Sequence, residues 1–364
     1  MTETWDVVVV GAGIVGLGHA VAAWESGASV LVIDRTRAAV GASVRNFGHV
    51  CVTGQVDELA DLAAVARERW LSLAGRAGFW AEESGGLAVA RTRAQLAVLE
   101  EVAGNSDRVR LLDAAETNRA LGGSGRALAG LALTADIRVD PRTAVPMLGQ
   151  WFAAQDRAEI RWGTSYLGHD GTRIQTSRGP VAAGRVVICA NFDLDQLYPD
   201  VAAEHGIRRC LLQMQRWADP GFRLRPAVLT GSSLLRYDAF SRTTAAAGVR
   251  AELAADQPDL LTYDCNVMFT QRPDGTLLVG DSHRYAEAAD PFTEARIDEV
   301  IRADVSDVLG VAPPVLERWQ GVYAKAERPY LRRRLDEVVE VCSVTTGLGM
   351  TIGLGLAARE PLVG

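Results

Sequence analysis

The sequence Asp6-Val-Val-Val-Val-Gly-Ala-Gly-Ile-Val-Gly16 decides the fold class. Its run of valines is typical of a strand that is buried on both faces in a parallel sheet. The glycines at 11, 13 and 16 have the G-x-G-x-x-G spacing of a dinucleotide-binding turn. In such a turn Gly11 allows a sharp bend, Gly13 allows the backbone to approach a pyrophosphate, and Gly16 allows the next helix to pack on the strand.

The residues around this turn complete a βαβ unit. Apolar residues recur at helical spacing over 14–26, Gly27 stands where a helix would end, and a β-branched run returns over 29–33. The second strand ends on Asp34, where an acidic side chain is expected to bond a ribose hydroxyl. We therefore expect an α/β fold in which the helix that begins at Ile14 directs its amides and its dipole at phosphates.

Further along the chain, two kinds of pattern predict two kinds of sheet. Another β-branched run without alternation over 185–189 predicts a further buried parallel strand. Between 211 and 280 the residues alternate instead, which predicts an antiparallel sheet. The expected alternating strands are 233–237, 263–271 and 276–279; the other expected elements are helices over 58–75, 94–103 and 296–309 and strands over 87–90 and 338–345.

Composition excludes several classes of function. The chain has 364 residues and a net charge of −7, which argues against a nucleic-acid surface. Its five cysteines form no C-x-x-C pair, so neither a disulfide framework nor a metal site is expected. The apolar stretch 7–23 contains glycines and His19 and follows acidic residues, unlike a signal peptide or membrane span. We expect a cytoplasmic protein without membrane or nucleic-acid partners.

A second glycine cluster selects the cofactor. NAD and FAD share the first fingerprint, but a nicotinamide dehydrogenase has no reason to bring its last residues back to the nucleotide. The segment Thr346-Gly-Leu-Gly-Met-Thr-Ile352 instead fits the glycine-rich strand-to-helix turn with which one large group of flavoproteins ends. The expected cofactor is therefore FAD.

Taken in order, these motifs resemble the D-amino-acid oxidase superfamily, which includes glycine oxidase and monomeric sarcosine oxidase. The resemblance also includes Asp34-Arg35 and the segment Gly41-Ala-Ser-Val-Arg-Asn-Phe-Gly48. It implies a Rossmann-like FAD-binding domain over 1–80, 140–205 and 320–364, and a substrate domain with a mainly antiparallel sheet over 81–139 and 206–319. The strings at 43–49, 233–237 and 280–283 are most similar to a bacterial subgroup associated with aminophosphonate catabolism.

The resemblance also implies cofactor-binding residues. Three groups are expected to hold, in turn, the ADP half, the phosphates with the flavin, and the pyrimidine end of the ring. They are Gly11, Gly13, Ile14, Gly16, Asp34 and Arg35; Ser43, Arg45 and Asn46; and Gly347, Gly349, Met350 and Thr351, with Tyr166 and Ala190 as further contacts.

Four departures from the superfamily pattern modify these expectations. Its Ala-x-Gly after the strand at 185–190 is Ala190-Asn-Phe192 here, and Gly321 replaces the cysteine that links flavin covalently in sarcosine oxidase-like members. FAD is therefore expected to be non-covalent. Leu278 stands at the position of a lysine used for reaction with oxygen, so dehydrogenation is better supported than oxidase activity. Thr351 replaces a lysine that binds the substrate carboxylate.

The missing carboxylate lysine implies another arrangement for binding an anion. A buried carboxylate or phosphonate requires a cation or several donors. The candidates are Arg45, His49, Arg236, His283 and Lys325, and Lys325 is the one lysine among 38 basic residues. Tyr323 matches an active-site tyrosine of the superfamily and would share one side of a strand with Lys325.

The predicted reaction is hydride transfer to flavin N5 from the carbon that bears a neutral amine. The substrate would be a small anionic amine: an aminophosphonate, an amino acid or an N-methyl amino acid. Oxygen or another acceptor would then take the electrons. One alternative is a 2-hydroxy-acid dehydrogenase, which needs a base such as His49 or His283. Another is a flavin-binding subunit of a complex, without chemistry of its own.

Overall fold

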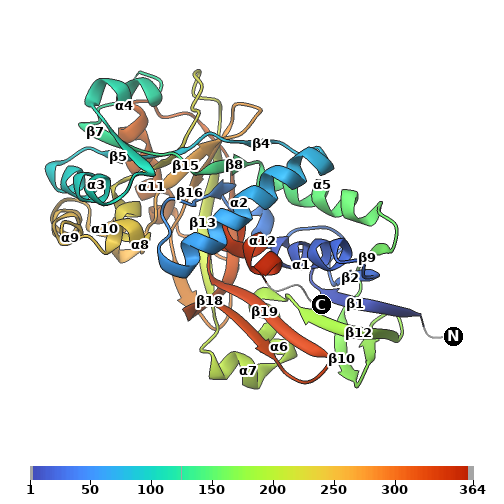
Figure 1. Cartoon of the computed structure of the whole chain (residues 1–364). Coiled ribbons are helices and arrows are strands. Elements are labelled where there is room, and N and C mark those ends of the chain that lie inside the picture. Colours follow the sequence, from blue (N-terminus) through green and yellow to red (C-terminus); the bar gives the residue numbers. More distant parts are fainter. Residues whose placement is uncertain (1–2, 124, 360–364) are drawn as a thin grey trace.

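A computed structural model describes residues 3–123 and 125–359. Residues 1–2 and 360–364 of the predicted FAD-binding domain, and residue 124 of the predicted substrate domain, lie outside the described residues. Within these ranges sixteen strands form one sheet, whose central order is β6-β7-β5-β14-β15-β16-β13-β18-β19-β12-β1-β2-β9. One half of this sheet is parallel and the other is mainly antiparallel (Figure 1). The α/β fold class is confirmed.

The parallel half contains the strands that the β-branched runs predict. Its central strand is β1, whose residues Val7–Val10 are buried because β2 and β12 flank it and helices and loops cover both faces. The next pairing joins distant parts of the chain, since Val186 of β12 lies opposite Val339 of β19. The five strands are β1 (Thr4–Val10), β2 (Val30–Asp34), β9 (Ala158–Trp162), β12 (Val181–Ile188) and β19 (Val339–Thr346).

Helices cover one face of the parallel half. Their apolar sides, including the fully buried Trp70 and Phe152, form one hydrophobic core with the strands. These helices are α1 (Ile14–Glu25), α2 (Asp57–Ala77), α5 (Pro141–Ala153) and α12 (Gly349–Arg359). The opposite face packs against β10 (Tyr166–Asp170), β11 (Arg173–Thr176), α6 (Leu194–Leu197) and α7 (Pro199–Glu204).

The antiparallel half has its own core around Trp217, Phe240 and Phe269. It joins the parallel half through the long strand β18 (Val315–Arg334), which pairs with β13 along its first part and with β19 along its second. The other strands of this half are β5 (Gly86–Ala90), β6 (Val109–Leu112), β7 (Ala129–Leu133), β13 (Arg208–Trp217), β14 (Ala227–Leu229), β15 (Met268–Gln271), β16 (Leu277–Gly280) and β17 (Arg284–Ala286).

Six further helices, three 3-10 turns and a small sheet complete the described chain. The helices surround the antiparallel half (Figure 1). They are α3 (Arg93–Asn105), α4 (Ala114–Ala120), α8 (Asp238–Ser241), α9 (Ala246–Asp256), α10 (Pro258–Thr262) and α11 (Ala295–Leu309), with 3-10 turns η1 (Ala42–Val44), η2 (Asn191–Asp193) and η3 (Gly231–Leu235). The small antiparallel sheet contains β3 (His49–Val50), β8 (Ile137–Val139) and β4 (Ala81–Glu82).

Two strand predictions in the antiparallel half are wrong. Residues 233–237 do not form a strand: 233–235 belong to the 3-10 turn η3, and Arg236 and Tyr237 follow it. The hydroxyl of Ser233 donates to the Val267 carbonyl (2.9 Å) and that of Ser232 accepts from the Val267 amide (2.9 Å), so side-chain bonds to a distant segment replace strand pairing. The predicted strand 263–271 is shortened to Met268–Gln271, because residues 258–262 form α10 and a loop follows.

Across residues 3–123 and 125–359, no helix is long and apolar enough to cross a membrane.

Candidate cofactor and substrate site

A single cavity of about 1170 Å³ contains every site residue that the sequence predicts. It begins at the carboxyl ends of β1 and β2, where ligands of open α/β sheets bind, and continues past β18 to the antiparallel half. Small-molecule pockets commonly measure roughly 300–1,000 Å³. This cavity therefore has room for a dinucleotide together with a small substrate.

The glycine turn between β1 and α1 has no space for side chains. Gly11 has a φ of +106°, and a Cβ there would lie 2.5 Å from the Cys189 carbonyl oxygen. A Cβ at Gly16 would lie 1.8 Å from the Gly11 carbonyl oxygen, and one at Gly13 would meet Ser43 Oγ at 3.1 Å. The turn thus brings bare backbone to the cavity wall at the amino end of α1, which is the geometry that holds a pyrophosphate.

The acidic residue at the end of β2 already has protein partners. Asp34 Oδ2 accepts a hydrogen bond from the Ala12 amide (2.8 Å), and Oδ1 accepts from both the amide (2.8 Å) and the hydroxyl (2.6 Å) of Thr36. These bonds fix the carboxylate against the glycine turn. Arg35, next to it, is largely exposed and forms an ion pair with Asp193 (2.6 Å).

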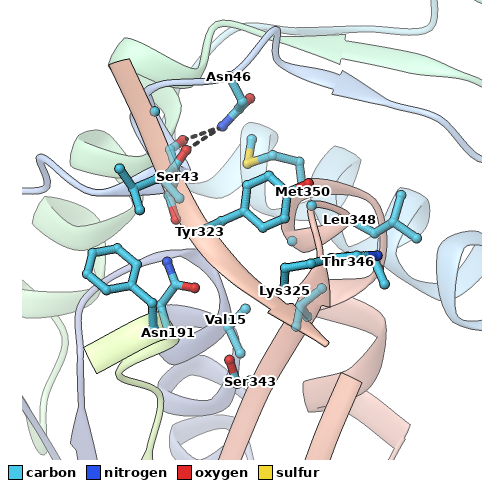
Figure 2. Close-up of a pocket in the computed structure, with 18 of the residues that line it drawn as sticks. Val15, Ser43, Asn46, Asn191, Tyr323, Lys325, Ser343, Thr346, Leu348 and Met350 are labelled. Atoms are coloured by element: carbon cyan, nitrogen blue, oxygen red, sulfur yellow. Dashed lines mark hydrogen bonds between the residues drawn. The ribbon is translucent and has the colours of Figure 1, made fainter. Parts of the chain in front are cut away.

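The segment after β2 reaches across to the amino end of α1. Ser43 Oγ accepts from the Ile14 amide (3.0 Å), so it lies where a phosphate oxygen would be expected. Asn46 has a structural part, since its Nδ2 donates to the carbonyls of Ala42 and Ser43 (both 3.0 Å; Figure 2). Arg45 donates to the Gln320 carbonyl (3.0 Å) and has no carboxylate partner among the described residues.

The turn between β19 and α12 forms the opposite end of the cofactor region (Figure 2). Gly347 has a φ of +78°, and a Cβ there would lie 3.0 Å from the ring of Tyr323. The Met350 carbonyl accepts from the Trp70 indole (2.8 Å), and Thr351 Oγ1 accepts from the Cys51 amide (3.3 Å). The positive end of the α12 dipole therefore faces the cavity, where it can stabilise the electron-rich pyrimidine end of a flavin.

The end of β12 shows how the chain does without the superfamily's glycine. After Ala190, Asn191 adopts a φ of +55°, which asparagine tolerates better than most residues. Its Oδ1 accepts from the Ala324 amide of β18 (2.7 Å), which joins the two segments. Tyr166 lines the cavity nearby, but its hydroxyl is already hydrogen-bonded to the Tyr198 hydroxyl (2.6 Å) and to His169 Nδ1 (3.0 Å).

Cationic and phenolic side chains gather at the part of the cavity that faces the antiparallel half. Arg236 Nη2 donates to the Tyr323 hydroxyl (3.1 Å) and Nη1 to that of Tyr285 (3.3 Å), while Asp264 is a distant ion-pair partner at 3.5 Å. Lys325 projects from the same strand as Tyr323 (Figure 2). In the described part of the chain no hydrogen bond or ion pair engages its ammonium. Burial, followed by the charge of Arg236, lowers the pKa of Lys325.

His283 is buried beside this group. Its Nδ1 donates to the Asp264 carbonyl (2.9 Å), and its ring lies edge-on to Tyr323 with centroids 6.4 Å apart. Burial, helped by the charge of Arg236, lowers the pKa of His283 to about 3. The ring is therefore neutral at pH 7, which removes it from the set of candidate cations.

His49 has a partner that the sequence did not reveal. Its Nε2 donates to Asp136 Oδ2 (2.8 Å), both side chains are buried, and Nδ1 has no partner among the described residues. Asp136 lies 87 residues away, just before β8, and no local pattern connects the two. Ligand atoms of His49, Asp136 and Cys51 lie within 4.8 Å of one another, so the expected absence of a metal stays a prediction.

The cavity wall also contains two buried acceptors that the sequence did not predict. Asp281 and Asn266 are 4% and 6% exposed, and Oδ1 of each has no hydrogen-bond partner among the described residues. Asp281 belongs to the quoted string 280–283, but nothing in that string distinguishes a buried acid from a turn residue. Only the folded chain places it in the cavity wall.

The structure separates the two departures that concern flavin chemistry. Gly321 lines the cavity, and because it is a glycine no sulfur is available for a covalent link at this position. A Cβ there would meet Leu212 at 3.3 Å. Leu278 is fully buried within β16 and is not part of the cavity wall. The preference for dehydrogenation over oxidase activity that was drawn from Leu278 stays a prediction.

Comparisons with known proteins agree with this geometry. The family described as FAD dependent oxidoreductase matches residues 6–359. Glycine oxidase from Geobacillus kaustophilus is similar in structure, with a TM-score of 0.78, 16% identity, and coverage of 99% of this chain and 95% of that one. For iminodiacetate oxidase from Chelativorans sp. BNC1 the TM-score is 0.69 and the identity 20%, with coverage of 97% of this chain and 93% of that one. For L-α-glycerophosphate oxidase from Mycoplasma pneumoniae with FAD bound the TM-score is 0.73 and the identity 15%, with coverage of 99% of this chain and 95% of that one. No curated protein matches the chain.

Proposed function

The chain belongs to the FAD-dependent oxidoreductase family, and from this premise we propose that it oxidises the C–N bond of a small anionic amine, with an aminophosphonate as the preferred class. The enzyme's cofactor is FAD, which when bound would supply the acceptor for a hydride from substrate carbon. The chain's own residues bind the substrate, orient it and exclude water. Glycine oxidase and iminodiacetate oxidase, both similar in structure, act on amines by name.

The observation that carries the proposal is the cationic group beside β18. Arg236 is mostly buried, its side chain being 22% exposed, and its nearest carboxylate lies at 3.5 Å, so its charge is not fully neutralised. Lys325 adds a second cation at the same part of the cavity, and the Tyr323 hydroxyl adds a donor. A phosphonate or carboxylate supplies the acceptors that such a group of donors requires.

Arginine and lysine together favour a phosphonate over a carboxylate. A carboxylate is satisfied by one guanidinium, whereas a phosphonate presents three oxygens and up to two charges. The resemblance of the strings at 43–49, 233–237 and 280–283 to the aminophosphonate-associated subgroup supports the same choice. Glycine and sarcosine are expected to be poorer substrates.

The test is anaerobic bleaching of the purified holoenzyme by a panel of compounds. The panel contains 2-aminoethylphosphonate and its N-methyl derivative, glycine, sarcosine, lactate and an uncharged alkylamine of similar size. We expect the aminophosphonates to reduce the flavin fastest. Equal or faster reduction by the uncharged amine would remove the argument for an anion site.

The His49–Asp136 pair supports a second candidate, oxidation of a hydroxy acid. An alcohol must lose its O–H proton during hydride transfer, and a buried histidine oriented by a carboxylate is suited to accept it. L-α-Glycerophosphate oxidase, whose substrate is an alcohol by name, has the same fold. Bleaching by lactate but by none of the amines would establish this candidate.

Other features of the protein are proposed on less direct grounds. The FAD should be non-covalent, because Gly321 offers no sulfur, and acid or heat should release it into the supernatant; a precipitate that stays yellow would contradict this.

The domain boundaries given above remain a prediction. A cytoplasmic location is supported by five free, buried cysteines. The rate at which the reduced flavin is reoxidised in air distinguishes oxygen from other electron acceptors.

A further inference from the structure

Asp281 and Asn266 are two neighbouring buried acceptors in the cavity wall. They lie on separate segments that two backbone hydrogen bonds join, from the Asn266 amide to the Asp281 carbonyl (2.9 Å) and from the Asp281 amide to the Asn266 carbonyl (3.1 Å). Both side chains line the cavity, and in both the buried Oδ1 has no hydrogen-bond partner within the described chain. Unpaired buried acceptors are costly, so both side chains lack a donor that the described chain does not supply.

The charges around Asp281 are arranged so that the carboxyl is not neutralised by the protein. No ion pair connects it to Arg236 among the described residues, and its contact with His283 is 3.9 Å from a ring that is neutral at pH 7. Burial raises the pKa of Asp281 to about 8 despite the opposing charge of Arg236. The titratable groups that face it from the surrounding elements are Arg236, Asp264, His283, Tyr237, Tyr323 and the thiols of Cys210 and Cys265.

The cavity therefore holds cations and, near them, an acid with which they form no ion pair within the described chain. Arg236 and Lys325 suit the anionic end of a substrate, and Asp281 with Asn266 suits a group that carries N–H donors. We propose that Asp281 and Asn266 bind the substrate nitrogen, and that the Asp281 carboxylate accepts one proton from the bound ammonium. This inference rests on the proposed function and adds to it the identity of the group that produces the neutral amine.

The proton transfer is balanced without any further reagent. One N–H bond of the ammonium breaks, one O–H bond forms on the Asp281 carboxylate, and the nitrogen keeps its electron pair. That pair must be free before hydride can leave the adjacent carbon. An alkylammonium has a pKa of about 10.4, as in lysine. A carboxyl that titrates between that value and neutral pH is a suitable acceptor.

The first test is the pH dependence of flavin reduction in Asp281→Asn holoenzyme, with N-methyl-2-aminoethylphosphonate as the probe. In the wild-type enzyme the apparent second-order rate constant of reduction should rise with pH and level off near pH 8, because Asp281 must be ionised to accept the proton. In Asp281→Asn it should be about 10²-fold lower at pH 7. It should also keep rising past pH 8 toward the pKa of the free amine.

The second test does not depend on turnover. With the flavin reduced beforehand, titration calorimetry in two buffers of different ionisation enthalpy counts the protons released when the same amine binds. Wild-type enzyme should release about one proton below pH 8 and fewer above it, since the ionised carboxylate then accepts the amine's proton itself. In Asp281→Asn this decrease near pH 8 should disappear.

Two controls separate the inference on Asp281 from the proposed function. Asp238→Asn removes a partly exposed carboxylate at the edge of the same cavity and should leave both pH profiles unchanged. Methylphosphonate, which lacks a nitrogen, should perturb the flavin spectrum of Asp281→Asn with wild-type affinity. If no amine reduces the wild-type enzyme, the proposed function fails. If the amine reduces wild type and Asp281→Asn with the same pH profile, this inference alone fails.

Discussion

The two ends of the cavity are built in different ways. At the cofactor end the chain presents backbone: glycines without side chains, the amino end of α1 and the amino end of α12. At the substrate end it presents side chains: the buried Asp281 and the partly buried Arg236 and Lys325. A backbone-built site fails when any atom is added to it, whereas a side-chain-built site loses affinity in steps as individual charges are removed.

The largest effect is expected from Gly13→Val. A Cβ at this position already meets Ser43 Oγ at 3.1 Å, and the two further methyl groups would occupy the pyrophosphate position. FAD content, measured from the ratio of absorbance at the flavin band to that at the protein band, should fall from about one per chain to below about one tenth. Gly75→Ala, in α2 with no atom within 4 Å of the added Cβ, is the control. Normal flavin content in Gly13→Val would show that this end does not depend on bare backbone.

An intermediate effect is expected from Arg236→Met. Removing one member of a buried charge pair with a ligand commonly costs about 2–5 kcal/mol. The apparent second-order rate constant of flavin reduction by an aminophosphonate should therefore fall by roughly 30- to 5,000-fold, with normal FAD content. Arg236→Lys should recover part of the loss. A similar loss with the uncharged amine would mean that Arg236 supports the fold and does not bind the anion.

A smaller effect is expected from Lys325→Met. This side chain is half-buried, so its contribution is more strongly screened than that of Arg236. We expect roughly a tenfold weaker apparent affinity for the aminophosphonate in the reductive half-reaction. Lys325→Arg retains the charge and should lie closer to wild type. If Lys325→Met slows only reoxidation in stopped flow, the residue acts in electron transfer to the acceptor. Wild-type rates in both halves would make it a bystander.

The smallest effect concerns pH. Because the pKa of Lys325 is lowered, its ammonium loses the proton at a lower pH than an ordinary lysine does. The affinity for methylphosphonate should therefore decline as the pH rises through this lowered pKa. In Lys325→Arg the decline should be absent, since arginine stays charged. An identical decline in both enzymes would assign it to another group.

The same contrast explains what the sequence could predict. The glycine turn and Asp34 lie within 24 residues, and each needs only local backbone geometry, so short-range patterns were sufficient. The substrate end depends on contacts such as His49–Asp136, 87 residues apart, and on burial that turns Asp281 into an unpaired acid. Short-range patterns contain neither kind of information.

The wrong strand at 233–237 has a related cause. Alternation of apolar and polar residues favoured a strand, but the hydroxyls of Ser232 and Ser233 bond the backbone of Val267 and hold a tight turn. This turn leads directly into Arg236, which it places beside β18. The local rule failed at a segment that positions a side chain for the substrate end.

The pairing of β12 with β19 has a consequence for how the protein is made. The partners Ile188 and Val341 are separated by about 150 residues. At roughly 5–20 residues per second, a ribosome takes on the order of 10–30 s to produce that interval. Throughout it, β12 has an open hydrogen-bonding edge, the kind of edge that attracts other strands, and α12 is absent from the cavity wall. A nascent chain stopped before residue 339 should therefore be unable to hold FAD and should be a substrate for chaperones.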